Sequence, residues 1–289
     1  MAADELTNRS TVRRLLHEAG IRPARRLGQS FLVDRGVVDA IARTVAEASP
    51  TRIIEIGAGL GAVTRALAPL ASDVVAIEID RRLVSVLERT VGDLDSVSVR
   101  HGDALDYAFD APAGTPRALV FGSLPYASTA SILQHLVAHR RAIKTAVVLT
   151  QREVAAKVEA SPGASGSALG ILVRAYADLE PIRQVGRESF HPVPDVDSTL
   201  WTIRFREKPR FTAEPEAFFA AVRAIYGVRR KMLRVALRPL LPREHVAEVL
   251  RTAEIEGDVR GETLGFEELD RLARALVTSG ISFGRGVQS

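Results

Sequence analysis

Glycines and a carboxylate near the start of the chain have the types and spacing to bind a nucleotide cofactor. Residues 55–62 read EIGAGLGA, so Gly57, Gly59 and Gly61 follow an apolar run. Glycines at such a turn let the backbone approach a ligand closely. Glu78 ends the next apolar run, where a carboxylate can accept hydrogen bonds from ribose hydroxyls. The pattern fits both the dinucleotide-binding turn and the E-x-G-x-G-x-G turn of S-adenosylmethionine (SAM) enzymes, and the glycines alone do not separate them.

Two further segments have residue types that could hold an adenine. Asp103, at the end of the third apolar run, could accept a hydrogen bond from an adenine amino group, or it could cap a helix. The fourth apolar run ends in the letters GSLPY, similar to the (Asn/Asp/Ser)-x-Pro-(Tyr/Phe) motif of amino methyltransferases. Methyl transfer needs acceptors that turn the lone pair of an exocyclic amine toward the methyl donor. The Ser123 oxygen and the carbonyl of Leu124 or Pro125 could supply two, and Tyr126 could stack on a base turned out of its helix.

The elements that must position these residues follow from a change of period along the chain. Strand-like apolar runs alternate with helical patterns, which predicts parallel β-α-β units. The sheet would be doubly wound and mainly parallel, in a Rossmann-like α/β domain, with the candidate residues at the carboxyl ends of its strands. The expected strands occupy residues 52–59, 73–80, 96–103, 117–126 and 145–151, with later strands at 171–185 and 198–207 and a loop at 160–170.

The last part of the chain predicts a separate helical domain. We place the boundary so that residues 1–210 form the sheet domain with a basic N-terminal extension, and residues 211–289 form a small all-helical domain. Its four expected helices cover residues 215–228, 229–241, 242–255 and 265–277.

Basic side chains gather toward the two ends of the chain. Residues 204–289 contain 16 Lys or Arg against 12 Asp or Glu. Arg230, Arg234 and Arg238 recur every four residues, so one continuous helix would place them on one face. Such a face suits RNA phosphates, which give affinity without reading sequence, although an ordinary solvated surface is the alternative. The N-terminal extension adds Arg22, Arg25 and Arg26.

Composition excludes several classes of protein. The 289 residues include no Cys, which excludes disulfides, thiolate nucleophiles and Cys-bound metal clusters. His135 and His139 have metal-site spacing, but a third ligand is not evident, so we expect no metal. No apolar run approaches the roughly 18 residues of a membrane span, and the first residues have no signal-peptide pattern. We therefore expect a cytoplasmic protein that needs no membrane.

Several of these motifs, in order, are similar to one family. The chain resembles the small-subunit ribosomal RNA adenine dimethyltransferases of the KsgA type, which are related to the macrolide-resistance methyltransferases, over about residues 20–275. The stretches that carry the resemblance are RRLGQSFLVD, EIGAGLGAVT, AIEID, GDAL, GSLPYASTASIL, QREVAAKV, FHPVPDVDSTLW, RRKMLR and RGETLGFEEL.

The resemblance implies an activity and a set of site residues. SAM would be the cofactor, and adenine N6 would attack its methyl group, with a second round giving dimethyladenine. Ribosomal RNA or a ribosomal subunit would be the partner of a monomeric enzyme. The adenine would be held at Ser123 to Tyr126, with Phe190 of the FHPVPD segment stacking on it. The cofactor contacts implied are Gln29, Ser30, Leu32, Gly57, Gly59, Glu78, Asp103 and Ser123.

The sequence departs from the family at three places. Ser30 and Ser123 stand where the family usually has Asn, and residues 163–169 lack the basic and aromatic residues common there. Ser123 keeps an acceptor oxygen but is shorter than Asn and lacks its amide donor, so the residues leave open one methyl group or two. They also leave open a resistance-type enzyme acting on another nucleotide and a ribosome-assembly factor with little activity. A nicotinamide dehydrogenase would leave the GSLPY segment unexplained.

Overall fold

The computed structural model describes residues 3–24, 28–109, 115–125, 127–160 and 166–280. The chain divides into two compact units. The first consists of Met1–Ala155 with Asp178–Phe205, and the second of Ala156–Ala177 with Arg206–Ser289. Among the described residues, no helix is both long and apolar enough to cross a membrane.

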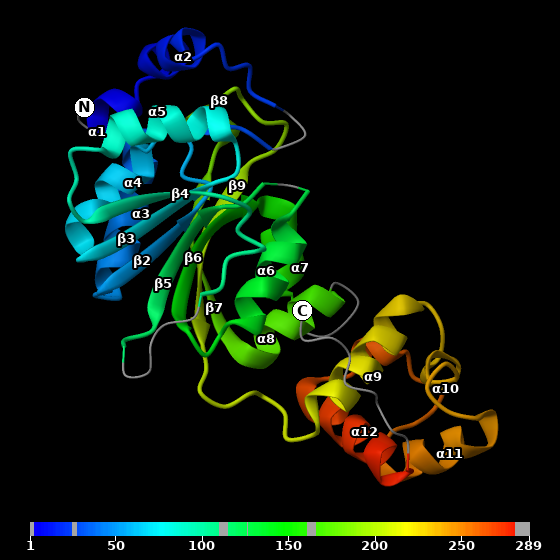
Figure 1. Ribbon diagram of the computed structural model, residues 1–289. Helices are drawn as coiled ribbons and strands as arrows, with labels where there is room; N and C mark the ends of the chain where they lie inside the picture. Colours follow the sequence, from blue (N-terminus) through cyan, green and yellow to red (C-terminus); the bar gives the residue numbers. More distant parts are fainter. Residues whose placement is uncertain (1–2, 25–27, 110–114, 126, 161–165, 281–289) are drawn as a thin grey trace. The chain divides into compact units, whose positions relative to one another are not determined.

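A seven-stranded sheet forms the centre of the first unit (Figure 1). Its first five strands in spatial order pair in parallel, and β9 pairs antiparallel to β6. The sheet is therefore mainly parallel, which confirms the predicted fold class. Its spatial order is β4 (Val97–His101), β3 (Asp73–Glu78), β2 (Arg52–Ile56), β5 (Ala118–Ser123), β6 (Ile143–Gln151), β9 (Ser198–Phe205) and β7 (Ala177–Val185).

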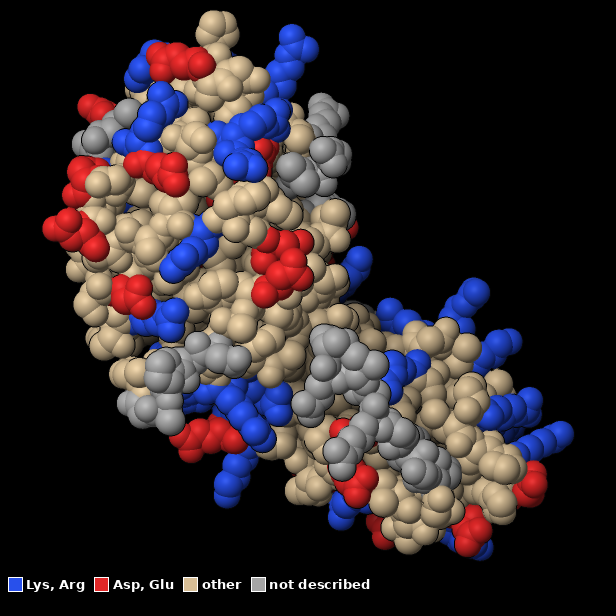
Figure 2. Space-filling model, viewed as in Figure 1, with Lys and Arg blue, Asp and Glu red and all other residues tan. Residues whose placement is uncertain are grey.

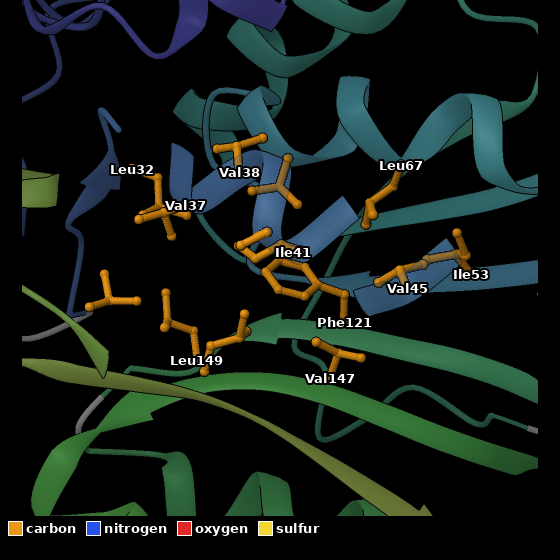
Figure 3. Packing of buried hydrophobic residues seen from close by; sticks show 14 of the residues in the cluster. Leu32, Val37, Val38, Ile41, Val45, Ile53, Leu67, Phe121, Val147 and Leu149 are labelled. Atoms are coloured by element: carbon orange, nitrogen blue, oxygen red, sulfur yellow. The ribbon is translucent and has the colours of Figure 1, made fainter. Parts of the chain in front are cut away.

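Helices cover both faces of this sheet. On one face α3 (Arg35–Glu47) and α4 (Ala62–Leu67) close a core with residues of several strands, part of which is seen in Figure 3. The period-two alternation of strands is the reason that Ile53, Phe121 and Val147 all point to this core. Near the β4 edge α5 (Arg81–Val91) packs on Ala76, and α6 (Thr129–Ala138) packs beside β6. The helix-forming patterns predicted between the strands are confirmed.

Several short helices, strands and 3-10 turns complete the structure. The N-terminal segment forms α1 (Ala3–Leu6) and α2 (Arg9–Glu18), whose apolar face packs beneath the turn after β2. The two-residue strand β1 (Phe31–Leu32) pairs antiparallel with β8 (Phe190–His191). The 3-10 turns are η2 (Ala68–Leu70), η3 (Arg187–Ser189) and, in the second unit, η4 (Gly261–Thr263).

The sequence interpretation of residues 160–185 was partly wrong. Residues 168–176 form helix α8 (Ala168–Tyr176), whereas a loop and then a strand were expected there. The Ser167 hydroxyl accepts a hydrogen bond from the Gly170 amide at 2.9 Å, which starts this helix inside the small-residue stretch. Helix α7 (Arg152–Glu159), which precedes it, was not predicted either.

The second unit is helical. It contains α8, α9 (Pro215–Gly227), α10 (Leu233–Ala236), α11 (Arg243–Thr252) and α12 (Phe266–Thr278). Its second segment starts at Arg206, whereas the boundary was expected at 211. The unit also includes α8, because the Tyr176 ring packs on Phe211 and the Tyr176 carbonyl accepts a hydrogen bond from the Arg206 amide. Aromatic rings from α9, α12 and the segment before them fill its core.

The second predicted helix of this unit was wrong in length. Instead of residues 229–241, only the single turn of α10 is helical. The Leu233 and Arg234 amides donate to the carbonyls of Val259 and Gly257, and Met232 forms an isolated bridge with Arg260. These amides are thus satisfied from another part of the chain, so no helix needs to precede them.

Candidate functional site

The turn after β2 has backbone angles that favour glycine. Gly57, Gly59 and Gly61 all have positive φ, at 74°, 59° and 87°. A Cβ built on Gly59 would lie 3.2 Å from the Phe31 ring, and one on Gly61 would lie 2.8 Å from Val91. Gly59 and Gly61 are therefore held between β1 and α5 with no room for side chains. Backbone surface is left to face a ligand.

Glu78, at the end of β3, is tied to this turn. Its Oε2 accepts a hydrogen bond from the Gly59 amide at 2.9 Å, and its Oε1 accepts one from the Asp80 amide at 2.9 Å. Burial raises the pKa of Glu78, while the hydrogen bonds from Asp80 and Gly59 lower it. The carboxylate has further acceptor capacity, because each oxygen carries two lone pairs.

Asp80 and Gln29 extend this tie to the N-terminal segment. The Gln29 amide nitrogen donates to Asp80 Oδ2 at 2.9 Å, and its side-chain oxygen accepts the Ala24 amide at 2.8 Å. Hydrogen bonds from Arg82 hold the pKa of Asp80 well below its usual range, so Asp80 is an ionised partner for Gln29. Gln29 thus fixes the segment that leads into β1.

The β1–β8 pair brings two distant motifs together. Leu32 lies opposite Phe190, and the Ser30 hydroxyl donates to the Pro192 carbonyl at 2.5 Å. Burial and the charges of Arg13 and Arg9 lower the pKa of His191, which favours its neutral form. The expected stacking role of Phe190 does not suit its position: the ring is 3% exposed and belongs to the apolar core.

One pocket joins the glycine turn, the β1 segment and the end of β5. It contains five residues predicted from the sequence: Ser30, Leu32, Gly57, Gly59 and Ser123. Its remaining lining residues are Leu6, Val12, Phe31, Glu55, Ala58, Leu60, Ala62, Val63 and Phe121.

Glu55 is a pocket residue that the sequence interpretation did not select. Its side chain is 1% exposed, and its Oε2 has no hydrogen-bond partner among the described residues. Burial raises its pKa to about 8, and the charge of Glu78 acts in the same direction. Thr64 lowers the pKa of Glu55 in part, which leaves one buried carboxyl oxygen on the wall of the pocket that can receive a positively charged or hydrogen-bond-donating group. The sequence signal that could have identified Glu55 is its position as the first residue of the E-x-G-x-G-x-G turn.

The end of β5 decides which carbonyl can hold a substrate amine. The Pro125 carbonyl already accepts from the Ser128 amide at 3.2 Å and from the Thr129 hydroxyl at 2.8 Å. The Leu124 carbonyl is therefore the better backbone acceptor beside Ser123. A Cβ on Gly122 would lie 2.6 Å from the Leu124 side chain, so glycine before Ser123 permits this fold of the segment.

The other predicted site residues lie outside the pocket or outside the described chain. Asp103 is exposed, and its Oδ1 accepts the Leu105 amide at 2.9 Å. It stays near Glu78 because the Gly102 amide donates to the Glu78 carbonyl at 3.0 Å. Tyr126, Arg25 and Arg26 lie outside the described residues.

The structure also describes the three spaced arginines and the pair of histidines that the sequence singled out. Arg230, Arg234 and Arg238 do not share one helix, because α10 covers only residues 233–236, so that reason for grouping them was wrong. His135 and His139 have structural roles: His135 Nε2 lies 3.0 Å from the Tyr107 carbonyl oxygen, and both rings pack on Phe109. In the part of the chain that the structure describes, no group of His, Asp and Glu could hold a metal.

Comparisons with known proteins identify the family of the chain. The family model described as ribosomal RNA adenine dimethylase matches residues 21–275. Ribosomal RNA small subunit methyltransferase A of Moorella thermoacetica is 39% identical over 274 residues, covering 91% of this chain and 95% of that protein. The protein of the same name from Thermobifida fusca is 38% identical over 269 residues, covering 91% and 93%.

Two solved structures share the fold over most of their length. A dimethyladenosine transferase from Plasmodium falciparum has a TM-score of 0.76 and 24% identity, covering 87% of this chain and 99% of that one. The 23S rRNA methyltransferase ErmE has a TM-score of 0.64 and 28% identity, covering 86% and 99%. The resemblance seen in the sequence is thereby confirmed: the chain is a methyltransferase and belongs to the ribosomal RNA adenine dimethylase family.

Proposed function

We propose that this protein transfers methyl groups from SAM to the N6 amine of an adenine in small-subunit ribosomal RNA, and that it adds two. One observation carries the proposal: a single pocket is lined by Gly57 and Gly59 of the glycine turn and by Ser123 of the GSLPY segment. A methyl donor held on the turn would therefore lie beside the group that holds the amine. The curated relatives are named small-subunit methyltransferases, which favours that subunit.

The residues of the pocket fit SAM. The glycine turn offers bare backbone, and Glu78 stands at the neighbouring strand end with acceptor capacity for ribose hydroxyls. Asp103 follows β4, two strands from the turn, and would accept a hydrogen bond from the purine amino group. Glu55 faces the same pocket with an unpartnered oxygen, which suits the ammonium group of the methionine part. When bound, SAM supplies a methyl group activated by its sulfonium.

The remaining chemistry is orientation of the amine. The Ser123 oxygen and the Leu124 carbonyl would accept the two N6 hydrogens, which turns the nitrogen lone pair toward the methyl group. With both hydrogens held in this way, the N6 nitrogen would be oriented to accept the methyl group that SAM would supply, and its excess proton would pass to water. Proximity and alignment supply most of the rate, so no side-chain base is required.

Serine at position 123 is compatible with a second transfer. Monomethyladenine has one N6 hydrogen left, so a single acceptor suffices in the second round. Because the Ser123 side chain is shorter than Asn, it leaves more room beside the nitrogen for the first methyl group. The second round would therefore need only one of the two acceptors used in the first.

The test is transfer of radiolabelled methyl groups from SAM to small subunits, large subunits and naked ribosomal RNA. Digestion to nucleosides and mass spectrometry then identify the product. Dimethyladenine confined to small subunits is the expected result. Label in the large subunit would favour a resistance-type enzyme, and no label from a protein that binds SAM would favour an assembly factor.

A matched pair of variants tests the role of Ser123. Ser123→Ala removes the side-chain acceptor and should slow transfer about 10- to 100-fold while SAM affinity stays within twofold. Ser85→Ala, on the exposed surface of α5, makes the same atomic change outside the pocket and should leave the rate unchanged. An unaltered rate for Ser123→Ala would remove this residue from amine binding.

A further inference from the structure

The second unit contains a cavity that no part of the proposed methyl transfer uses. Its volume is about 610 Å³, within the usual range for pockets that bind small molecules. It is formed by α10, α11 and the chain that follows α11. The lining residues are Arg234, Val235, Arg238, Arg243, Val246, Ala247, Leu250, Arg251, Ile255 and Gly257.

The charge of this cavity has one sign. Four of its lining residues are arginines and none is acidic. All four arginines are exposed, and no ion pair joins any of them to another described residue. Figure 2 shows Lys and Arg side chains projecting along the edge of the second unit where Figure 1 places α10 and α11. The guanidinium groups are therefore available to an anionic ligand.

The floor of the cavity is apolar. Val246 and Leu250 are each 4% exposed, and Val235 and Ile255 are half-buried beside them. Apart from the guanidinium groups, no lining side chain carries a hydrogen-bonding group. The cavity can therefore recognise a ligand by negative charge and by an apolar face.

Backbone contacts hold the walls in place without a ligand. The Arg234 amide donates to the Gly257 carbonyl at 3.1 Å, and the Ile255 amide donates to the Leu250 carbonyl at 3.0 Å. A Cβ on Gly257 would lie 3.1 Å from Leu250 Cδ1, so glycine at this position allows the segment after α11 to approach that helix closely. A preformed cavity avoids the entropy loss of ordering on binding.

We propose that this cavity binds one unpaired nucleotide of the ribosomal RNA substrate, an inference that rests on the proposed function. The arginines would hold the flanking phosphates by paired N–H groups, and their planes together with Val246 and Leu250 would contact the faces of the base. An acidic peptide would satisfy the charge but would leave its amides without partners on the apolar floor. A nucleotide satisfies both features, because its base has an apolar face and its phosphates are anionic.

The first test fills the cavity without changing its charge. Ala247 is exposed and lines the cavity, so Ala247→Trp places an indole where the base would lie. Stacking of one base on protein supports roughly tenfold in affinity, so binding of a fluorescent single-stranded RNA oligomer should weaken about tenfold. Binding of a blunt RNA duplex should change less than twofold. Thr252→Trp, exposed on the same helix outside the cavity, is the control and should alter neither.

The second test changes charge and does not depend on the first variant. Arg243→Glu with Arg251→Glu should lower the slope of log affinity against log salt by about 1.4 for the single-stranded oligomer. Lys208→Glu, exposed elsewhere in the unit, is the control for a single charge reversal, and it should lower that slope by less than half as much.

The outcomes separate this inference from the proposed function. Equal weakening of single-stranded and duplex RNA by Ala247→Trp, or no weakening, would overturn the nucleotide cavity. Displacement of the oligomer by a poly-aspartate peptide but not by AMP would assign the cavity to an acidic protein partner and overturn the proposal. Methyl transfer by the unaltered protein is measured separately. A failure of methyl transfer would contradict the proposed function, and the RNA-binding results would still test the cavity.

Discussion

The Glu78 carboxylate accepts a hydrogen bond from the Gly59 amide at 2.9 Å. This bond joins the end of β3 to the turn after β2, the two motifs proposed to hold the cofactor. The other oxygen of Glu78 accepts a hydrogen bond from the Asp80 amide, so the orientation of the carboxylate plane is fixed. A ligand that contacts Glu78 therefore meets a carboxylate whose position is already set.

Removal of this carboxylate should abolish tight SAM binding. Glu78→Ala deletes the charged acceptor and releases the Gly59 amide, so we expect SAM affinity to fall about 10- to 100-fold by calorimetry. Glu88→Ala, on the exposed face of α5, is the matched control. Unchanged affinity in Glu78→Ala, with the fold intact by circular dichroism, would remove Glu78 from the cofactor site.

A methyl group on the glycine turn should destabilise the fold. Gly59→Ala forces a Cβ to 3.2 Å from the Phe31 ring at a φ of 59°, so the free energy of unfolding should fall by about 1–3 kcal/mol. Urea denaturation measures it. Gly102→Ala meets nothing within 4 Å and should cost less than about 0.5 kcal/mol. Equal losses in both variants would contradict the close approach of Phe31.

Glu55 should make stability fall as pH rises. Its folded-state pKa of about 8 lies above the unfolded value of 4.5, so the folded protein keeps a proton that the unfolded chain releases between these values. The free energy of unfolding should therefore fall by up to about 1.4 kcal/mol per pH unit through that window. Denaturation curves from pH 5 to 8 should show the slope, and Glu55→Gln should flatten it. A slope that survives this substitution would assign it to other groups.

Gln29 should act on cofactor affinity through position. Gln29→Ala loses the bonds to Asp80 and to the Ala24 amide, and we expect a threefold to tenfold weaker affinity for SAM. Gln29→Glu places a second carboxylate beside the ionised Asp80, so it should weaken binding further at low salt and recover as salt is raised. If both variants bind alike at every salt concentration, the contact with Asp80 has no part in cofactor binding.

The strands of the parallel part of the sheet and the glycine turn could be predicted because their signals are local. Alternating apolar runs identified β2, β3, β5 and β6. Glycine marks the turn because it is the residue that adopts positive φ most readily. The Arg230 spacing was misleading because spacing alone does not show that a helix is continuous, and α10 ends after one turn. The apolar run at 171–176 fits a buried helix as well as a strand, which periodicity does not distinguish.

The rest of the site depends on contacts with no local signal. The pairing of Phe31 with His191 uses strands of two residues, which are too short to show a period. The neutral state of Glu55 arises from burial on all sides, and a sequence letter does not reveal burial. The cavity of the second unit depends on backbone bonds between α10 and residues 257–259, which bring the chain that follows α11 back to α10.

The β1–β8 pair also orders events during synthesis of the protein. Ser30 and Phe31 leave the translating ribosome early, but their partners His191 and Pro192 follow only after most of the sheet has been made. The glycine turn and β3 can fold in the growing chain while one wall of the pocket is still missing. A nascent chain stopped before β8 should therefore bind cofactor weakly, and tight binding should appear only once β8 has been made.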